Sequence, residues 1–258
     1  MLKFSYQQFN TNLMNNPKVV LITGAARRVG AEMVRHLHQS GLNIVLHYRS
    51  SSKDASELAE QLNTKRSDSV KLLKGDLKDY SNIPDLMKQG IALFGHIDVL
   101  INNASTFYPT DLTDVTEDIW EDLMGVNLKA PVYLTQALAA ELKRNQGCIV
   151  NIVDIHGDRP LKDYSVYSIA KAGLIMFTKS MARELAPEIR VNGIAPGAIM
   201  WPEEQHYEGM HQEIISRTAL KREGSPKDIA ETALFLIEKA GYITGQIIAV
   251  DGGRTLSN

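Results

Sequence analysis

Short apolar runs alternate with longer amphipathic stretches from Val19 to Val250. Apolar runs of this length, bounded by Gly, Pro and Asn, are typical of buried parallel strands, and the stretches between them predict helices. The strands are expected near 18–23, 43–48, 70–75, 97–102, 147–153, 189–195 and 246–250. The pattern predicts an α/β protein, a single doubly wound Rossmann-type domain with a seven-stranded parallel sheet and helices on both faces.

The remaining segments divide the chain into an arm, a domain and a loop. Residues 1–17 read as a short polar arm before a domain that occupies 18–258. Long helices with dense apolar faces are expected near 116–144 and 164–186. The less regular stretch 198–226 is expected to form a substrate loop. In a doubly wound fold, ligands bind at the carboxyl ends of the strands, so we expect the site there.

Composition excludes several partners. The 28 Lys and Arg residues balance 30 Asp and Glu residues, which leaves no basic excess for nucleic acid or an anionic membrane. No apolar run approaches the length of a membrane span, and the first 17 residues lack a signal pattern, so a cytoplasmic protein is expected. Cys148 is expected to be an inert core thiol, and the seven His residues show no metal-ligand spacing.

A glycine-rich turn follows the first expected strand and opens a helix. It reads Thr-Gly-Ala-Ala-Arg-Arg-Val-Gly over residues 23–30. Backbone amides at such a helix start can face a pyrophosphate, which makes Gly24, Arg28, Val29 and Gly30 candidate cofactor contacts. The alternative is a tight turn that carries two surface arginines.

The end of the second strand indicates which dinucleotide is bound. An NAD site usually has Asp or Glu there for the ribose hydroxyl, but this chain has no carboxylate before Asp54. A guanidinium and hydroxyls suit a 2′-phosphate, and Arg28 would add a second cation, so we expect NADPH/NADP rather than NADH. The candidate residues are His47, Tyr48, Arg49, Ser50 and Ser51. The alternative is a solvated arginine in a serine-rich loop.

Two further strand ends are candidates for the rest of the cofactor. Asp76, followed by Leu77, is placed to accept a hydrogen bond from the adenine amino group. Asn103 and Ala104 follow the fourth strand, where small residues let the backbone approach the adenosine ribose and the nicotinamide side. The alternatives are a helix cap at Asp76 and an ordinary turn at 102–104.

Tyr167 and Lys171 are candidate catalytic residues. They are four residues apart on an expected helix, so they share one face. A nearby Lys⁺ favours tyrosinate, so we expect it to lower the pKa of the Tyr167 phenol and make it a general acid near neutral pH. The spacing alone is common in helices, and its weight comes from the other motifs.

Together these motifs resemble the short-chain dehydrogenase/reductase superfamily over nearly the whole chain. The resemblance includes Asn127, the Pro196-Gly197 pair and a closing Val-Asp-Gly-Gly at 250–253. It implies that Asn127 holds a proton-relay water, that Lys171 also binds the nicotinamide ribose, and that Pro196 and Gly197 flank the nicotinamide. Without the resemblance, Asn127 is a helix-bending polar residue and Pro196-Gly197 is a turn.

Asp154 departs from the superfamily pattern. It lies 13 residues before Tyr167, where most members have a serine that donates to a substrate carbonyl. An ionised carboxylate cannot donate and repels the charge that develops on that oxygen. In a pocket that disfavours charge, Asp154 is expected to be partly protonated and to help protonate a ring nitrogen while hydride adds to the neighbouring carbon. That chemistry suits the C=N bond of a pterin.

The motifs around this departure resemble the pteridine reductases, including dihydromonapterin reductase relatives. The resemblance implies that Phe107 stacks on a pterin or folate substrate and that Ser105 contacts both ligand and cofactor. Met200 and Trp201 are expected beside the substrate's side chain, and a homotetramer is expected. Two alternatives remain, a carbonyl reductase such as a 3-oxoacyl thioester reductase, and a non-catalytic NADP(H)-binding protein. The retained Asn127, Tyr167 and Lys171 argue against the second.

Overall fold

The computed structural model describes residues 17–199 and 208–256, and seven strands in this part of the chain form one parallel sheet. The strand order is β3-β2-β1-β4-β5-β6-β7. Each strand coincides with one of the seven apolar runs in the sequence, so the predicted fold class is confirmed. The strands are β1 Val19–Ile22, β2 Asn43–Tyr48, β3 Val70–Lys74, β4 Val99–Asn102, β5 Cys148–Ile152, β6 Arg190–Pro196 and β7 Ile247–Val250.

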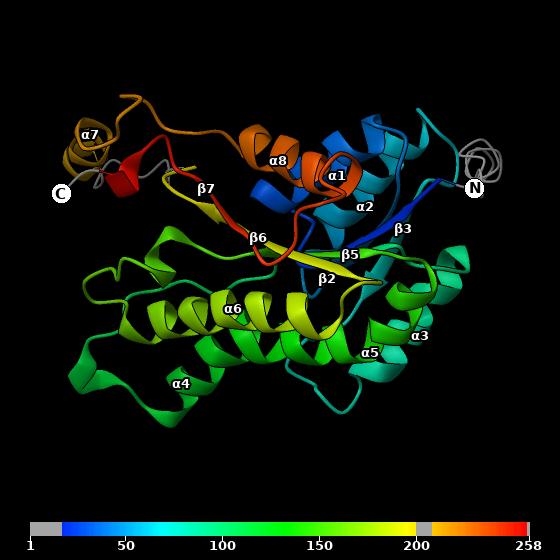
Figure 1. Cartoon of the computed structure of the whole chain (residues 1–258), viewed down its shortest axis with the longest axis horizontal. Coiled ribbons are helices and arrows are strands. Elements are labelled where there is room, and N and C mark those ends of the chain that lie inside the picture. The colour runs from blue at the N-terminus through cyan, green and yellow to red at the C-terminus, as the bar shows by residue number, and fades with distance from the viewer. Residues whose placement is uncertain (1–16, 200–207, 257–258) are drawn as a thin grey trace, which may run out of the picture.

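Helices cover both faces of the sheet (Figure 1). One layer contains α1 (Arg28–Gln39), α2 (Ser52–Asn63) and α8 (Pro226–Glu238), and the other contains α3 (Ile83–Phe94), α5 (Ala130–Arg144) and α6 (Ser165–Glu184). Successive side chains of a strand point to opposite faces, so Val20 and Ile22 of β1 join the first core while Val19 and Leu21 join the second. Burial on both faces explains why the strands are continuous apolar runs rather than alternating ones.

The long helix expected near 116–144 is interrupted. It consists of α4 (Glu117–Met124), a π-helical turn at Gly125–Lys129, and α5. Asn127 lies in the π turn, where its Nδ2 donates to Leu123 O at 2.8 Å and to Thr106 O at 2.9 Å. Thr106 lies in the loop after β4, 21 residues earlier in the chain. The π turn therefore coincides with a tertiary contact, which the local sequence pattern does not predict.

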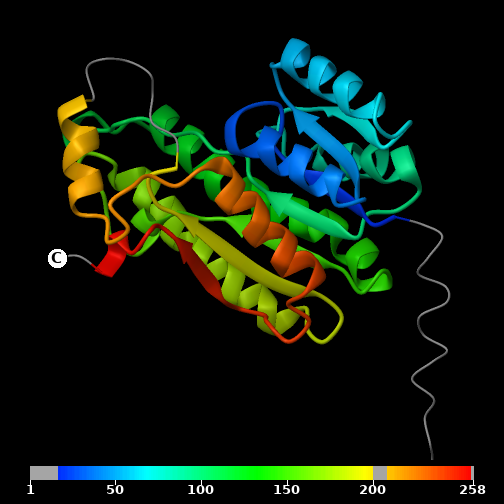
Figure 2. The ribbon, with the colours of Figure 1, turned by 90° about the horizontal axis from the view of Figure 1, so that it is seen from above.

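The stretch 198–226 contains a helix, α7 (Glu208–Ser216), in its described part. Both views place α7 at the end of the molecule opposite α2 and α3 (Figure 2). Met200 and Trp201, expected beside the substrate, lie outside the described residues, as does the arm up to residue 16. The prediction of a substrate loop stays a prediction.

Cys148 is the buried thiol that its apolar setting indicates. It is 3% exposed in the core beneath α1 and α8, and burial raises the pKa of its thiol to about 11. The thiolate needed for nucleophilic chemistry is therefore scarce at neutral pH. Among the described residues, no helix is long and apolar enough to cross a bilayer.

Candidate active site

A cavity of about 530 Å³ opens at the carboxyl ends of the strands. Its size is typical of small-molecule sites. The residues that the sequence assigned to the cofactor and the substrate line it wherever they are described, apart from Asn127, which lies one hydrogen bond behind Ser105. They are Gly24, Arg28, Val29, Gly30, His47, Tyr48, Arg49, Ser50, Ser51, Asp76, Leu77, Asn103, Ala104, Ser105, Phe107, Asp154, Tyr167, Lys171, Pro196 and Gly197.

The turn after β1 is packed directly against the loop after β4. Gly24 has φ +60°, and a Cβ on it would lie 2.9 Å from Ala104 Cα. The Thr23 hydroxyl oxygen accepts from the backbone N–H groups of Asn103 (2.9 Å) and Ala104 (3.0 Å). The backbone therefore comes close to the cavity where a side chain would block it, which fits a dinucleotide's phosphates.

The start of α1 is an anion-binding feature by its own chemistry. Within the described part of the chain no side chain caps the helix, its first turn has no acidic residue, and its first residues, Arg28, Val29 and Gly30, line the cavity. Arg28 and Arg49 are exposed at this end and have no ion-pair partner among the described residues, whereas Arg27 pairs with Asp54 at 2.7 Å. These features fit a phosphorylated cofactor.

His47 lines the cavity, but both nitrogens of its ring contact backbone atoms of neighbouring loops. Its Nδ1 accepts from Gly24 N at 3.3 Å, and its Nε2 lies 3.2 Å from Gly75 O. The ring is 2% exposed, and burial lowers its pKa to about 4. The neutral tautomer with the proton on Nε2 satisfies both contacts. Both ring nitrogens are thus engaged by backbone.

Tyr167 and Asp154 form a direct pair. The Tyr167 hydroxyl donates to Asp154 Oδ2 at 2.8 Å, and Asp154 Oδ1 accepts from His156 N at 2.8 Å. Burial and the Asp154 carboxylate raise the pKa of the Tyr167 phenol well above its usual value. The expectation of a lowered phenol pKa is therefore wrong for this arrangement, because the nearest charge is an anion.

Lys171 lies on the same face of α6 as Tyr167 but bonds elsewhere. Its Nζ donates to Ile152 O at 2.9 Å and lies 5.6 Å from the centre of the Tyr167 ring. The side chain is 2% exposed, and burial lowers its pKa to about 8. Lys171 remains mostly protonated at neutral pH and places a positive charge in the cavity lining, and the nicotinamide contact that the resemblance implies stays a prediction.

Asn127 holds the segment that carries Ser105. Its Oδ1 accepts from Ser105 Oγ at 2.6 Å, and its Nδ2 reaches Thr106 O and Leu123 O. The Asn127 side-chain amide therefore fixes the loop that contains Ser105 and Thr106. The water that the resemblance places on Asn127 stays a prediction. Sequence reasoning missed Thr106, which lines the cavity and receives the Asn127 amide.

Phe107 is exposed at the cavity rather than packed in the core. The side chain is 54% exposed, its ring stacks on Tyr164 with centres 4.5 Å apart, and it meets the Tyr167 ring edge-on at 4.8 Å. Sequence reasoning missed Tyr164, although an aromatic residue three positions before Tyr167 was visible. In the described ranges, no group of three or more His, Cys, Asp or Glu side chains is arranged to hold a metal ion.

Comparison with known proteins places this geometry in a family. A family model described as enoyl-(acyl carrier protein) reductase matches residues 24–255. Pteridine reductase 1 of Leishmania tarentolae is 34% identical over 93% of this chain and 96% of its own length. The chain belongs to the short-chain dehydrogenase/reductase superfamily. It is thus a short-chain oxidoreductase of the kind that uses a nicotinamide cofactor.

Other relatives in the superfamily have a different substrate class in their names. The 3-oxoacyl-(acyl-carrier-protein) reductase FabG of Staphylococcus aureus is 33% identical over 93% of this chain and 99% of its own length. The FabG of Staphylococcus epidermidis is 34% identical over 92% of this chain and 98% of its own length. Identity at this level supports both substrate classes equally, so the choice depends on the site.

Proposed function

We propose that this chain uses NADPH to reduce a C=N bond of a dihydropterin or dihydrofolate to the tetrahydro form. The observation that carries the proposal is the 2.8 Å hydrogen bond from the Tyr167 hydroxyl to Asp154 Oδ2. A carboxylate at this place offers no donor to a ketone oxygen. It suits a substrate whose reacting atom is a basic ring nitrogen, which takes a proton instead of developing oxyanion charge.

The proposed mechanism assigns a role to each residue. NADPH, when bound, supplies a hydride to the carbon of the C=N bond, and the nitrogen must then gain one proton. Burial and Asp154 raise the phenol pKa, so Tyr167 keeps its proton at neutral pH although it is a weaker acid than a free phenol. We assign to it the transfer of that proton to the ring nitrogen, whose basicity rises as hydride adds to the neighbouring carbon. Asp154 orients the phenol and shares the proton with it. Lys171 holds the nicotinamide ribose end.

The cofactor preference is also part of the proposal. Arg28 and Arg49 line the cavity together with Ser50 and Ser51, and Asp76 and Asp154 are the carboxylates among its described lining residues. A 2′-phosphate suits guanidinium and hydroxyl donors. The exposed half of Phe107 offers the pterin ring a stacking face, with Ser105 at its edge.

Exposed apolar side chains on the helical face support the homo-oligomer, a homotetramer, that the resemblance implies. Among the described residues these are Val132 and Tyr133 on α5 and Ile169 and Met176 on α6. Met176 is 61% exposed. Exposed apolar side chains on neighbouring helices of one face are a feature that protein interfaces share.

The test compares substrates and variants side by side. Purified protein is given NADPH with dihydrobiopterin, dihydromonapterin, dihydrofolate or an acetoacetyl thioester, and cofactor oxidation is followed by absorbance. We expect turnover of pterins or folate, and a loss of about 10²-fold or more in Asp154→Ser and Tyr167→Phe, because each removes part of the proton donor.

A matched control separates chemistry from surface charge. Asp158 is an exposed acid on the same loop, so Asp158→Asn should leave the rate unchanged. Turnover of the thioester alone would make the chain a carbonyl reductase and overturn the proposal. Pterin turnover that survives Asp154→Ser intact would remove its chemical basis.

A further inference from the structure

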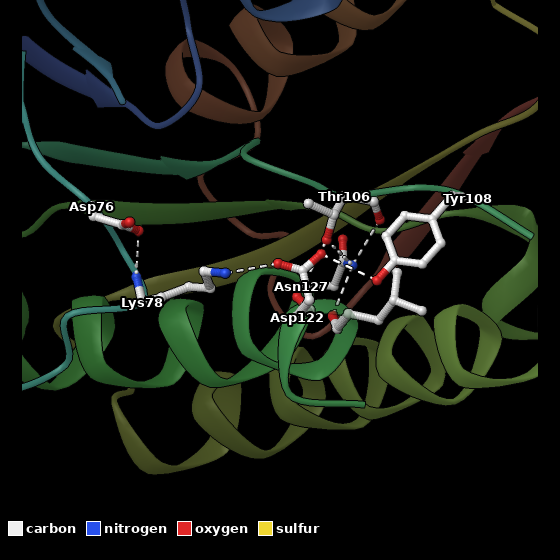
Figure 3. Close-up of polar contacts among 7 residues, drawn as sticks. Asp76, Lys78, Thr106, Tyr108, Asp122 and Asn127 are labelled. Carbon is white, nitrogen blue, oxygen red and sulfur yellow. Dashed lines mark hydrogen bonds and ion pairs between the residues drawn. The ribbon is translucent and has the colours of Figure 1, made fainter. Parts of the chain in front are cut away.

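Asp122, near the end of α4, connects two loops that both contribute residues to the cavity lining. Its Oδ1 accepts from Lys78 Nζ at 2.8 Å, and its Oδ2 accepts from the Tyr108 hydroxyl at 3.2 Å (Figure 3). Lys78 belongs to the segment after β3, and Tyr108 belongs to the segment after β4. One carboxylate therefore joins two segments that are separate in the chain.

On the catalytic side, Asp122 anchors the segment that carries Ser105. The Thr106 hydroxyl donates to the backbone O of Asp122 at 3.3 Å. Asn127 ties the same segment to the π turn through Thr106 O and Leu123 O, and it accepts from Ser105. Figure 3 shows Thr106, Tyr108 and Asn127 gathered around Asp122. A shift of Asp122 would thus be transmitted to Ser105 and Phe107.

On the cofactor side, the contact is made by the segment that begins at Asp76. Asp76 lines the cavity, and its Oδ1 accepts from Lys78 N at 3.0 Å. Tyr80 makes a second contact, because its hydroxyl packs against Gly125. A Cβ added to Gly125 would lie 2.5 Å from this hydroxyl. The segment 76–80 therefore rests on the junction of α4 and the π turn at two points.

We propose that Asp122 is a positioning residue that couples occupancy of the adenosine half of the cavity, through Lys78, to the placement of Ser105 and Asn127. The inference rests on the proposed cofactor and goes beyond it. A ligand that orders Asp76 fixes the Lys78 backbone, and Lys78 then holds Asp122 against Tyr108 and Thr106. The Lys78 and Asp122 side chains are 37% and 28% exposed, and ion pairs as exposed as this contribute little to folding stability. We therefore expect the pair to act on the position of the loops.

The experiment uses the adenosine half of the cofactor alone. Full-length protein is titrated with 2′,5′-ADP, and amide hydrogen exchange is measured with and without it. In the wild type, the ligand should slow exchange in residues 105–110 and in the π turn. In Asp122→Asn and Lys78→Met, 2′,5′-ADP should still bind, but this remote protection should be lost.

A matched control is available elsewhere on the surface. Lys18 and Glu238 form an ion pair of 2.9 Å with exposures of 40% and 34%, far from the cavity lining. Lys18→Met should keep the full remote protection. Double replacement of Asp122 and Lys78 should be no worse than either single change, because both act through one contact.

Steady-state kinetics gives the second readout. Asp122→Asn should lower kcat by about tenfold at saturating NADPH while the Michaelis constant for the substrate changes little, because the catalytic end is misplaced after binding. Remote protection that persists in Asp122→Asn overturns the coupling and leaves the proposed function standing. Absence of 2′,5′-ADP binding in the wild type overturns the proposed cofactor and the coupling with it.

Discussion

Arg28 shows at the scale of one residue that stability and binding can oppose each other. Its φ is +50°, a left-handed conformation that is unfavourable for any residue with a Cβ. A glycine there would be unstrained in the folded chain. The strained arginine at the cavity therefore fits the proposed contact with a cofactor phosphate.

The prediction is that Arg28→Gly leaves stability unchanged or raises it by up to about 1 kcal/mol, since relief of strain exceeds the added entropy of the unfolded chain. The same change should raise the Michaelis constant for NADPH about tenfold by removing charge-assisted hydrogen bonds to phosphate. Urea unfolding and steady-state kinetics with NADPH and NADH measure both effects.

Arg35→Ala is the matched control for Arg28. Arg35 lies on the same helix, pairs with Glu32 at 3.5 Å and does not line the cavity. It should change neither cofactor's Michaelis constant. Equal losses with NADPH and NADH in Arg28→Gly would mean that Arg28 does not contact the 2′-phosphate.

Single residues also show what the sequence could not provide. Tyr167 and Lys171 were identified from spacing and residue type and Asp154 from its departure from the superfamily pattern, and all three line the cavity. The predicted direction of the Tyr167 pKa shift was wrong, because burial of the phenol and the adjacent Asp154 carboxylate, which both raise the pKa, depend on tertiary structure. Lys171 donates to Ile152 O, while Asp154 receives the phenol hydrogen bond.

At the scale of elements, the junction of β1 and α1 depends on close backbone packing. A Cβ on Gly30 would lie 2.6 Å from Gly24 O and 2.7 Å from Asn103 Nδ2. Gly30→Ala should therefore push α1 away from the β4 loop at a cost of about 1–3 kcal/mol. The same shift should weaken NADPH binding, as measured by titration of the cofactor's fluorescence.

Gly241→Ala is the control for this element. A Cβ on Gly241 would meet nothing within 4 Å, so the variant should bind NADPH as the wild type does. If Gly30→Ala loses stability but keeps its NADPH affinity, the turn would not be the phosphate site.

The elements divide into those that local pattern predicts and those that it does not. The strands were found because each is a continuous apolar run, and α6 was found close to its observed bounds, Ser165–Glu184. The π turn at Gly125–Lys129 was missed, since its Asn127 bonds to Thr106, 21 residues earlier. Lys78 and Asp122 were missed because their importance arises from tertiary contact.

At the scale of the whole molecule, His47 on β2 connects the loops after β1 and β3, and their assembly should depend on pH. The folded chain keeps the ring neutral down to a pKa of about 4, while the unfolded chain binds a proton near pH 6.5. Between these values the unfolded state holds more protons, so the free energy of unfolding falls as pH drops. The largest contribution is about 3 kcal/mol.

Urea unfolding at several pH values between 7 and 4 checks this prediction. His47→Asn keeps an acceptor for Gly24 N and cannot titrate. It should be less stable than the wild type at pH 7 by about 1 kcal/mol, for the lost bond to Gly75 O, and its stability should decline less on acidification. Parallel curves for the two proteins would assign the acid sensitivity to other groups.

The hydrophobic pattern did not predict the order of the strands in the sheet. This order has a consequence for folding during synthesis. β1 lies between β2 and β4, so its second neighbour is synthesised about 80 residues after it. Until then, a nascent chain presents an unpaired edge whose four residues are all apolar, a known hazard for aggregation. The same late pairing brings Ala104 against Gly24. A ligand that contacts both Gly24 and Ala104 can therefore bind only after β4 has paired with β1, and it would oppose the separation of these two strands.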